Sequence, residues 1–164
     1  MIDQITLKRI EDIHPSLREE LRQIYKEICE ALTGNIGCRF VQVYRTFEEQ
    51  HELFLQRPKV TNADAGQSYH NYGLAVDFCL INDNDGNGKV SGSEISWSTK
   101  QDLDRDGVAD WMEVVKIFTK YGWKWGVSFG DYPHFEKSPY NWRELLKRYQ
   151  NKEFIEDTSY LKLD

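Results

Sequence analysis

The hydrophobic and polar positions in the first third of the chain follow first a helical and then an extended pattern. Between residues 15 and 33, leucine and isoleucine recur every three or four positions and Gly34 follows, which predicts an amphipathic helix. Apolar β-formers over 39–44 predict a short strand. Thr46 and Glu49 then form a capping-box pattern, which predicts a second helix that ends near residue 55.

The rest of the chain continues with short elements of both kinds. In chain order, the pattern predicts a loop over 57–69, a strand over 73–81, a helix over 111–121 that Gly122 ends, short strands over 123–125 and 133–136, and a helix over 140–149. Few strands with several helices predict an α+β fold whose helices pack on one side of the sheet. The length of 164 residues suits a single domain over 1–164.

The net charge of −6 is concentrated in one window. From Asp83 to Glu113 there are eight acidic and three basic residues, which gives −5, and the 19 acidic and 18 basic residues elsewhere give −1. A nucleic-acid-binding surface would be basic, so we expect no nucleic-acid partner. No apolar run is long enough to span a bilayer, so we expect no membrane partner. The acidity therefore calls for a local explanation.

The cysteines and two of the four histidines offer no site. Cys29, Cys38 and Cys79 form an odd set without a short paired spacing, which argues against a disulfide framework and a thiolate metal site. We expect them to be small core residues. His14 precedes a proline and is expected to be a surface cap residue, and His51 lies among glutamates and is expected in solvent.

His70, Asp77 and His134 form a candidate metal site. Asp77 alternates with apolar residues in the predicted strand over 73–81, and a buried carboxylate is costly unless it is paired or bound to a metal. His70 precedes that strand, and His134 lies among aromatic residues. Two imidazoles and one carboxylate match the ligand set of a catalytic zinc, which leaves the fourth position for water. On residue types alone, buried polar residues joined by hydrogen bonds are an equal alternative.

These residues lie within a longer two-part pattern, Ser68-x-His70-x-x-Gly73-x-Ala75-x-Asp77 followed by Asp131-x-x-His134. The pattern resembles the signature of the D-Ala-D-Ala metallopeptidase family, which includes VanX- and VanY-type peptidases. The stretches 66–77, 124–126 and 131–136 are most similar to the L-alanyl-D-glutamate endopeptidases of phage endolysins, and the likeness spans about residues 40 to 150. The loop over 56–59 is shorter than the Gly-rich stretch usual in the family. The resemblance implies a small antiparallel sheet of the hedgehog and D-Ala-D-Ala peptidase type.

The resemblance also implies roles for the side chains around the metal. His70, Asp77 and His134 would bind zinc. Asp131 would take a proton from water and pass it to the leaving amine, and Arg45 would stabilise the polarised carbonyl oxygen.

Three alternatives stay open for the neighbouring residues. Arg45 also suits a salt bridge to a nearby carboxylate. Glu136 is the alternative base to Asp131. Ser68 would either orient the substrate or fix the loop that carries His70.

Two stretches of the acidic window match the twelve-residue EF-hand calcium loop, with oxygen ligands at positions 1, 3, 5 and 9, Gly at 6 and Glu at 12. The predicted calcium ligands are Asp83, Asp85, Asn87, Lys89, Ser91 and Glu94 in loop 1, and Asp102, Asp104, Asp106, Val108, Asp110 and Glu113 in loop 2. A strand leads into loop 1, so we expect an EF-hand-like insertion over about 82–113 and no full EF-hand pair. The alternative is a solvated acidic loop.

These features together predict a zinc-dependent peptidoglycan hydrolase that cuts the L-Ala–D-Glu bond of stem peptides, with Zn²⁺ and Ca²⁺ as cofactors. Calcium would order the insertion and so position the zinc ligands or a groove wall. A D,D- or L,D-carboxypeptidase on the same polymer and a non-catalytic, metal-stabilised binding module are the alternatives.

We expect the protein to be a monomer. The N-terminus has no charged region followed by an apolar one, so we expect synthesis in the cytoplasm without a signal peptide and action on the cell wall after release.

Overall fold

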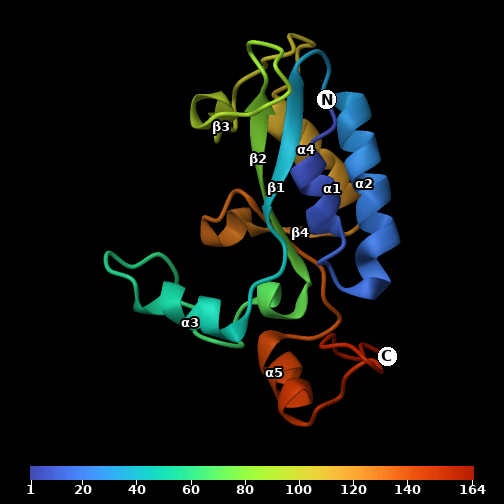
Figure 1. The fold of residues 1–164 in the computed structure, drawn as a ribbon, viewed down its shortest axis with the longest axis vertical. Helices are drawn as coiled ribbons and strands as arrows, with labels where there is room; N and C mark the ends of the chain where they lie inside the picture. Colours follow the sequence, from blue (N-terminus) through green and yellow to red (C-terminus); the bar gives the residue numbers. More distant parts are fainter.

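A small antiparallel sheet lies at the centre of the structure, a computed structural model that describes residues 1–164 (Figure 1). Across the sheet the strands are ordered β1 (Ile36–Gln42), β2 (Ala75–Asn82), β5 (His134–Glu136) and β4 (Lys124–Trp125), and β3 (Ile95–Ser96) pairs with the last part of β2. In this register Asp77 of β2 lies opposite His134 of β5. The expected α+β fold with a small antiparallel sheet is confirmed.

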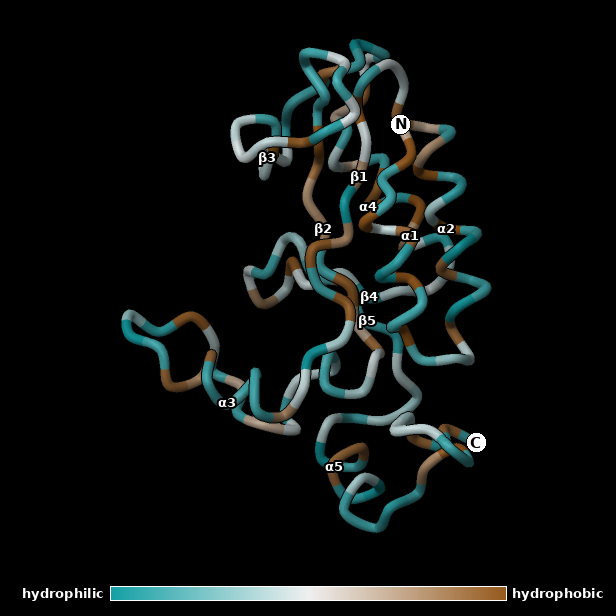
Figure 2. The backbone as a smooth tube through the Cα atoms, in the orientation of Figure 1, coloured by the Kyte–Doolittle hydropathy of each residue, from teal (hydrophilic) through white to brown (hydrophobic).

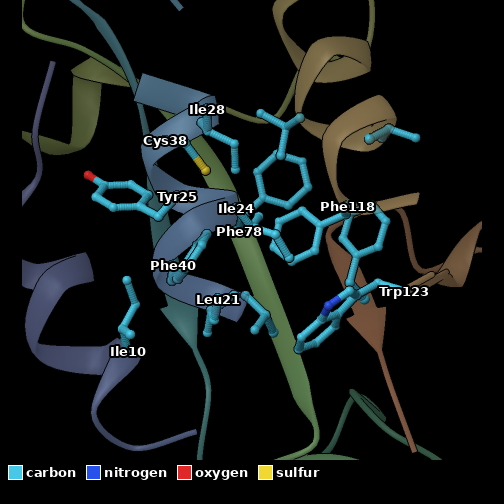
Figure 3. Close-up of a cluster of buried hydrophobic side chains, with 14 of the residues drawn as sticks. Ile10, Leu21, Ile24, Tyr25, Ile28, Cys38, Phe40, Phe78, Phe118 and Trp123 are labelled. Carbon is cyan, nitrogen blue, oxygen red and sulfur yellow. The ribbon is translucent and has the colours of Figure 1, made fainter. Parts of the chain in front are cut away.

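One face of the sheet is covered by α2 (Arg18–Ala31) and α4 (Asp110–Lys120). Alternate residues of β2 point towards these helices, and the ring centre of Phe78 lies 4.3 Å from that of Trp111 in α4. Figure 3 shows Phe78 and Phe118 within this core. Because side chains alternate along a strand, the intervening residues of β2 project to the opposite face, and Asp77 is one of them.

The outer edge of β1 is covered by a helix that the hydrophobic pattern did not predict, α1 (Gln4–Ile10). Asp3 caps this helix by accepting the Thr6 N–H at 3.0 Å, and Arg39 Nη2 donates to the same carboxylate at 2.8 Å. The Thr6 hydroxyl in turn accepts the N–H of Phe40 at 3.0 Å, so α1 occupies hydrogen-bonding groups that an edge strand would otherwise expose. Seven residues are too few to show a helical period.

Two further helices lie beyond the end of the sheet, α3 (Phe47–Leu55) and α5 (Trp142–Gln150) (Figure 1). The rings of Phe47 and Tyr149 stack at 4.3 Å and join the two helices. The expectation that the helices pack on one side is therefore correct for α2 and α4 and wrong for α3 and α5. The physical reason is a second buried cluster, which consists of Tyr72, Leu74, Leu145 and Leu161.

Most predicted elements are confirmed with small shifts. The helix predicted over 15–33 is a 3₁₀ turn, Pro15–Leu17, followed by α2, and the strand predicted over 39–44 begins earlier, at Ile36. The predicted surface position of His14 is wrong, because only 2% of the residue is exposed and its Nε2 lies 2.7 Å from the carbonyl oxygen of Leu161. His14 does cap the 3₁₀ turn, as predicted.

The cysteines are core residues, as expected: Cys38 and Cys79 are fully buried and Cys29 is half-buried, all as free thiols. His51 is half-exposed and lies 2.7 Å from the carboxylate of Asp64, which agrees with its predicted place in solvent. None of the helices combines the length and the apolar character that crossing a bilayer requires.

Candidate metal centre and cleft

His70, Asp77 and His134 meet on the face of the sheet opposite α2 and α4. His70 Nε2 lies 3.2 Å from Asp77 Oδ1, and His134 Nδ1 lies 3.0 Å from the same oxygen. One ligand atom of each residue lies within 4.8 Å of the other two. Asp77 and His134 are brought together by the pairing of β2 with β5, and His70 arrives from the turn that precedes β2.

The turn that carries His70 is the short 3₁₀ helix η2 (Tyr69–Tyr72). Ser68 caps it, and its hydroxyl accepts the N–H of His70 at 3.3 Å. Gly73 ends it in the left-handed conformation, with φ of 66°. This bonding favours the role of Ser68 in fixing the His70 turn, although Ser68 also lines the cleft beside the metal centre.

The outer nitrogen of each imidazole is held by a protein acceptor. His70 Nδ1–H donates to the carbonyl oxygen of Val43 at 3.0 Å, and His134 Nε2–H donates to Glu136 Oε2 at 2.9 Å. His70 therefore turns its Nε2 lone pair inwards, where that nitrogen is buried without a hydrogen-bond partner. A lone pair that faces a carboxylate in a buried site is unfavourable unless a cation lies between them. The three residues thus fit a zinc ion with oriented ligands.

The charges in the centre shift the titration of its members. Burial opposes the ionisation of Asp77, but the positive charge that His70 and His134 carry when they are protonated outweighs it and holds the pKa of Asp77 well below its usual range. Burial likewise opposes the charged form of His134, but hydrogen bonds to Asp77 and Glu136 raise its pKa to about 9. In the metal-free protein His134 is therefore protonated at neutral pH.

Asp131 and Glu136 both face the centre but are bonded differently. Glu136 accepts a hydrogen bond from His134 and lies 3.5 Å from Lys124 Nζ, so both of its oxygens have partners. Asp131 follows Gly130, which is in the left-handed conformation with φ of 77°, and its N–H donates to the carbonyl oxygen of Gly126. Its carboxylate has neither a hydrogen bond nor an ion pair. Burial, and after it the charge of Asp77, raises the pKa of Asp131.

Arg45 follows β1 and reaches the same cleft. It makes no ion pair: its Nη1 donates to Gln50 Oε1 at 3.0 Å, so the salt bridge considered from the sequence is absent. Gln50 is fully buried and its Nε2 also donates to the carbonyl oxygen of Ala63 at 2.7 Å. Gln50 thereby ties Arg45 to the loop that forms one cleft wall. A buried, doubly bonded glutamine is a tertiary feature that the sequence pattern did not reveal.

These side chains line one cleft with a volume of about 790 Å³. One wall comes from the loop 60–63 and the turn 67–70, and the other from the segment 124–136. Exposed Phe129 stands on this second wall, and its ring lies 5.8 Å from that of His134. The cleft thus offers a metal centre, an unbonded carboxylate and two cations, Arg45 and Lys124, to one ligand.

The acidic window forms two loops at the other end of β2, far from Asp77 (Figure 1). Asn82, the last residue of β2, is five residues beyond Asp77, which corresponds to about 17 Å along the strand. Figure 2 shows the loops as hydrophilic and most of β2 as hydrophobic. The insertion therefore does not touch the candidate zinc ligands. Any coupling between the two sites would run through β2, through α4, or through the turn after α2, where Thr33 donates two hydrogen bonds to Asp104.

Carboxylates gather in each loop. In each of three sets of acidic residues, one oxygen atom from every member lies within 4.8 Å of those of the other two members. The sets are Asp83, Asp85 and Glu94; Asp102, Asp104 and Asp110; and Asp104, Asp106 and Glu113. Asn87 and Ser91 hydrogen bond to Asp85 and Glu94 within loop 1. Lys89 and Val108, the predicted ligands at position 7 of the two loops, are exposed.

The two loops lead into different elements. Loop 1 connects β2 to a 3₁₀ turn, Gly92–Glu94, whereas loop 2 runs directly into α4, which begins at Asp110. In loop 2, Asp110 Oδ1 and Glu113 Oε2 are buried without a hydrogen-bond partner. Burial, together with the four neighbouring aspartates, raises the pKa of Glu113 to about 7.

Comparison with known proteins identifies a family and a relative. A family model described as D-alanyl-D-alanine carboxypeptidase matches residues 61–137, which include all three candidate zinc ligands. The chain is also 39% identical over 138 residues to the peptidoglycan L-alanyl-D-glutamate endopeptidase CwlK of Bacillus subtilis (strain 168). That alignment covers 78% of this chain and 75% of the relative.

Proposed function

The chain belongs to the D-Ala-D-Ala metallopeptidase family, and on that premise we propose that it is a zinc-dependent peptidase that hydrolyses stem peptides of peptidoglycan. The observation that carries the zinc proposal is the buried, unpartnered Nε2 of His70, which faces the carboxylate of Asp77. The substrate class is supported by the identity to a relative named for its action on peptidoglycan.

His70, Asp77 and His134 would hold the zinc ion, which when bound supplies a Lewis acid and lowers the pKa of bound water to about 7. Asp131 accepts the proton of the attacking water and delivers it to the leaving amine, because its carboxylate is free of other partners. Arg45 donates hydrogen bonds to the carbonyl oxygen, where negative charge develops. Gln50 keeps the guanidinium in the cleft.

The bond most consistent with the proposal is L-Ala–D-Glu, because CwlK, to which the chain is similar over most of its length, is named for that bond. The family model favours a second candidate, a carboxypeptidase that removes a terminal residue. Mass spectrometry of purified muropeptides after digestion distinguishes the two. Products cut after L-Ala support the endopeptidase, and loss of the terminal residue alone supports the carboxypeptidase.

Metal analysis combined with digestion tests the proposal as a whole. The purified protein should contain one zinc ion per chain in the cleft, lose hydrolysis on chelation and regain it with Zn²⁺. Zinc-loaded protein that leaves muropeptides intact would favour the non-catalytic binding module.

We also propose that the two acidic loops bind Ca²⁺ and that the cation stabilises the insertion. The unpartnered, buried oxygens Asp110 Oδ1 and Glu113 Oε2 support this, because buried carboxylate oxygens without donors attract a cation. A chelator that removes Ca²⁺ but leaves zinc bound should lower the melting temperature. Activity that falls in parallel would support coupling between the two sites, and unchanged activity would limit calcium to a structural role.

A further inference from the structure

Lys124 is a cation on the cleft wall, and it has no role in the reaction proposed above. It lies in β4, directly opposite Glu136 of β5, and its Nζ is 3.5 Å from Glu136 Oε1. Opposed residues of antiparallel strands project to the same face, and so do residues two apart on one strand. Lys124, Glu136 and His134 therefore project from the same face of the sheet.

The ion pair with Glu136 leaves the ammonium group of Lys124 available. The Lys124 side chain is 65% exposed, and the other carboxylate oxygen of Glu136 is held by His134. The Glu136 side chain is only 12% exposed, but an ammonium group in solvent, 3.5 Å from its partner, is screened by water and exchanges readily with other partners. The second cation of the cleft, Arg45, is half-buried and bonded to Gln50, so it is far less free to move.

The two cations stand on opposite sides of the zinc ligands. Arg45 follows β1 and Lys124 lies in β4, whereas Asp77 and His134 are on the two strands between them. Three steps between neighbouring strands correspond to about 14 Å. A peptide bound across the sheet would thus meet one cation before the scissile bond and the other after it.

Asp131 identifies the side that receives the leaving group. Its N–H donates to the carbonyl oxygen of Gly126, two residues after Lys124, so the proton donor and Lys124 belong to the same wall. The leaving amine has to lie beside Asp131. In an L-Ala–D-Glu bond this amine belongs to D-Glu, which has two carboxyl groups and continues the chain through only one. One carboxylate therefore stays free next to the scissile bond.

We propose that Lys124 binds this free carboxylate and makes the enzyme prefer D-Glu over its carboxamide counterpart; the assignment rests on the proposed function. Apart from the candidate zinc ligand His134, the charged groups that this wall presents beside Lys124 are Asp131 and Glu136, which are acids that would repel a carboxylate. Lys124 is the group of opposite charge, and a charge-assisted hydrogen bond from it distinguishes a carboxylate from a neutral amide.

The test uses two peptides that differ in one group. Both are N-acetyl-L-Ala-D-Glu-L-Lys joined through the γ-carboxyl of D-Glu, one with the free α-carboxylate and one with the α-carboxamide. In the zinc-loaded wild type, kcat/KM should favour the acid about tenfold, which corresponds to one charge-assisted hydrogen bond. Lys124→Met should abolish the preference, and Lys124→Arg should keep most of it.

A control variant and a binding measurement separate recognition from structural damage. Lys120→Met removes a lysine of similar exposure, 63%, from α4 and should keep the wild-type preference. In an Asp131→Asn background, calorimetry should show that Lys124→Met weakens binding of the acid about tenfold and leaves the amide unchanged.

Equal losses for both peptides in Lys124→Met would overturn the proposal, because they would indicate that Lys124 acts only through Glu136 and His134. A wild type that cleaves neither peptide would instead refute the proposed L-Ala–D-Glu bond. The two failures are therefore distinguishable.

Discussion

Single residues in the cleft are distinguished by their hydrogen bonds and not by their type. Asp131 and Glu136 are both carboxylates near the metal centre. Glu136 accepts the Nε2–H of His134 and pairs with Lys124, whereas the carboxylate of Asp131 is unbonded. Its bond to the candidate zinc ligand His134 therefore suits Glu136 to orient that imidazole, whereas a carboxylate without such bonds suits Asp131 to proton transfer.

Two isosteric variants should separate these roles. Asp131→Asn should lower kcat by about 10²–10⁴-fold and leave zinc affinity close to wild type, because it removes a proton carrier and no ligand. Glu136→Gln should weaken zinc binding by about 10–100-fold, because His134 loses its charged acceptor. Zinc titration and muropeptide kinetics measure both effects. The reverse pattern would identify Glu136 as the base.

Zinc binding should depend on pH through His134. Its pKa is raised to about 9 by Asp77 and Glu136, so below that pH zinc has to displace a proton from the imidazole. The dissociation constant for zinc should therefore fall by up to about tenfold per pH unit as pH rises towards 9. Competition against a chromogenic chelator from about pH 6.5 to about pH 8.5 measures the slope. Glu136→Gln should make the slope level off at lower pH, and a flat wild-type profile would contradict the assignment.

At the scale of elements, the short helix η2 decides where His70 lies. Ser68 starts it and Gly73 ends it, and the direction of the chain then reverses into β2. Gly73 has φ of 66°, and a Cβ there would lie 2.9 Å from the backbone nitrogen of His14. Both the backbone conformation and the close approach require glycine.

Gly73→Ala should destabilise the fold and loosen the metal centre. Gly34 is a matched control, because its φ of 62° is similar but a Cβ there meets nothing within 4 Å. Gly34→Ala should cost about 1 kcal/mol from backbone strain alone. Gly73→Ala should cost about 1–3 kcal/mol more, because His14 has to move. Urea unfolding gives the stabilities, and equal costs with unchanged zinc affinity would refute the argument.

At the scale of the whole molecule, the candidate metal centre and the acidic loops lie at the two ends of β2 and differ in burial and charge. The candidate zinc ligands His70 and His134 are buried and hydrogen bonded to Val43 and Glu136, whereas most residues of the acidic loops are exposed and carry like charges. The sheet between them is packed against α2 and α4 through the main core. The loops can therefore affect stability without contacting the cleft.

Without calcium, the stability of the molecule should depend on Glu113. The pKa of this carboxyl is about 7 in the folded protein and its ordinary value is 4.5, so between these values the folded state binds a proton that the unfolded state has lost. The contribution of Glu113 to the free energy of unfolding should therefore be highest below pH 4.5 and should be lost as pH rises through 7. Melting curves in a calcium chelator measure this contribution, and Glu113→Gln should remove it.

Added Ca²⁺ should counteract this loss of stability at rising pH, because the cation pairs with the ionised carboxylate of Glu113. Melting temperatures that change neither with the Glu113→Gln substitution nor with the cation would contradict calcium binding at loop 2.

More of the metal centre than of the surrounding cleft could be predicted from the sequence. His70, Asp77 and His134 stand in a long pattern with a chemical reason for each residue type, and the structure brings the three together. The burial of His14 and the role of Gln50 were not predictable, because both depend on partners elsewhere in the chain, Leu161 and Ala63. Helix α1 was not predicted because seven residues are too few to show a helical period, and because Phe40, its hydrogen-bond partner in β1, is distant in the chain.

By itself, the sequence determined the elements that depend on neighbours in the chain: the period of α2, the capping box of α3, and the alternation that sets Asp77 apart from the core residues of β2. Only the tertiary structure decided that β2 lies between β1 and β5. This pairing places His134 opposite Asp77, puts the acidic loops at the far end of β2, and sets Arg45 and Lys124 on either side of the metal centre. Local hydrogen bonds and side-chain period encode the former, whereas strand order and register arise from long-range packing.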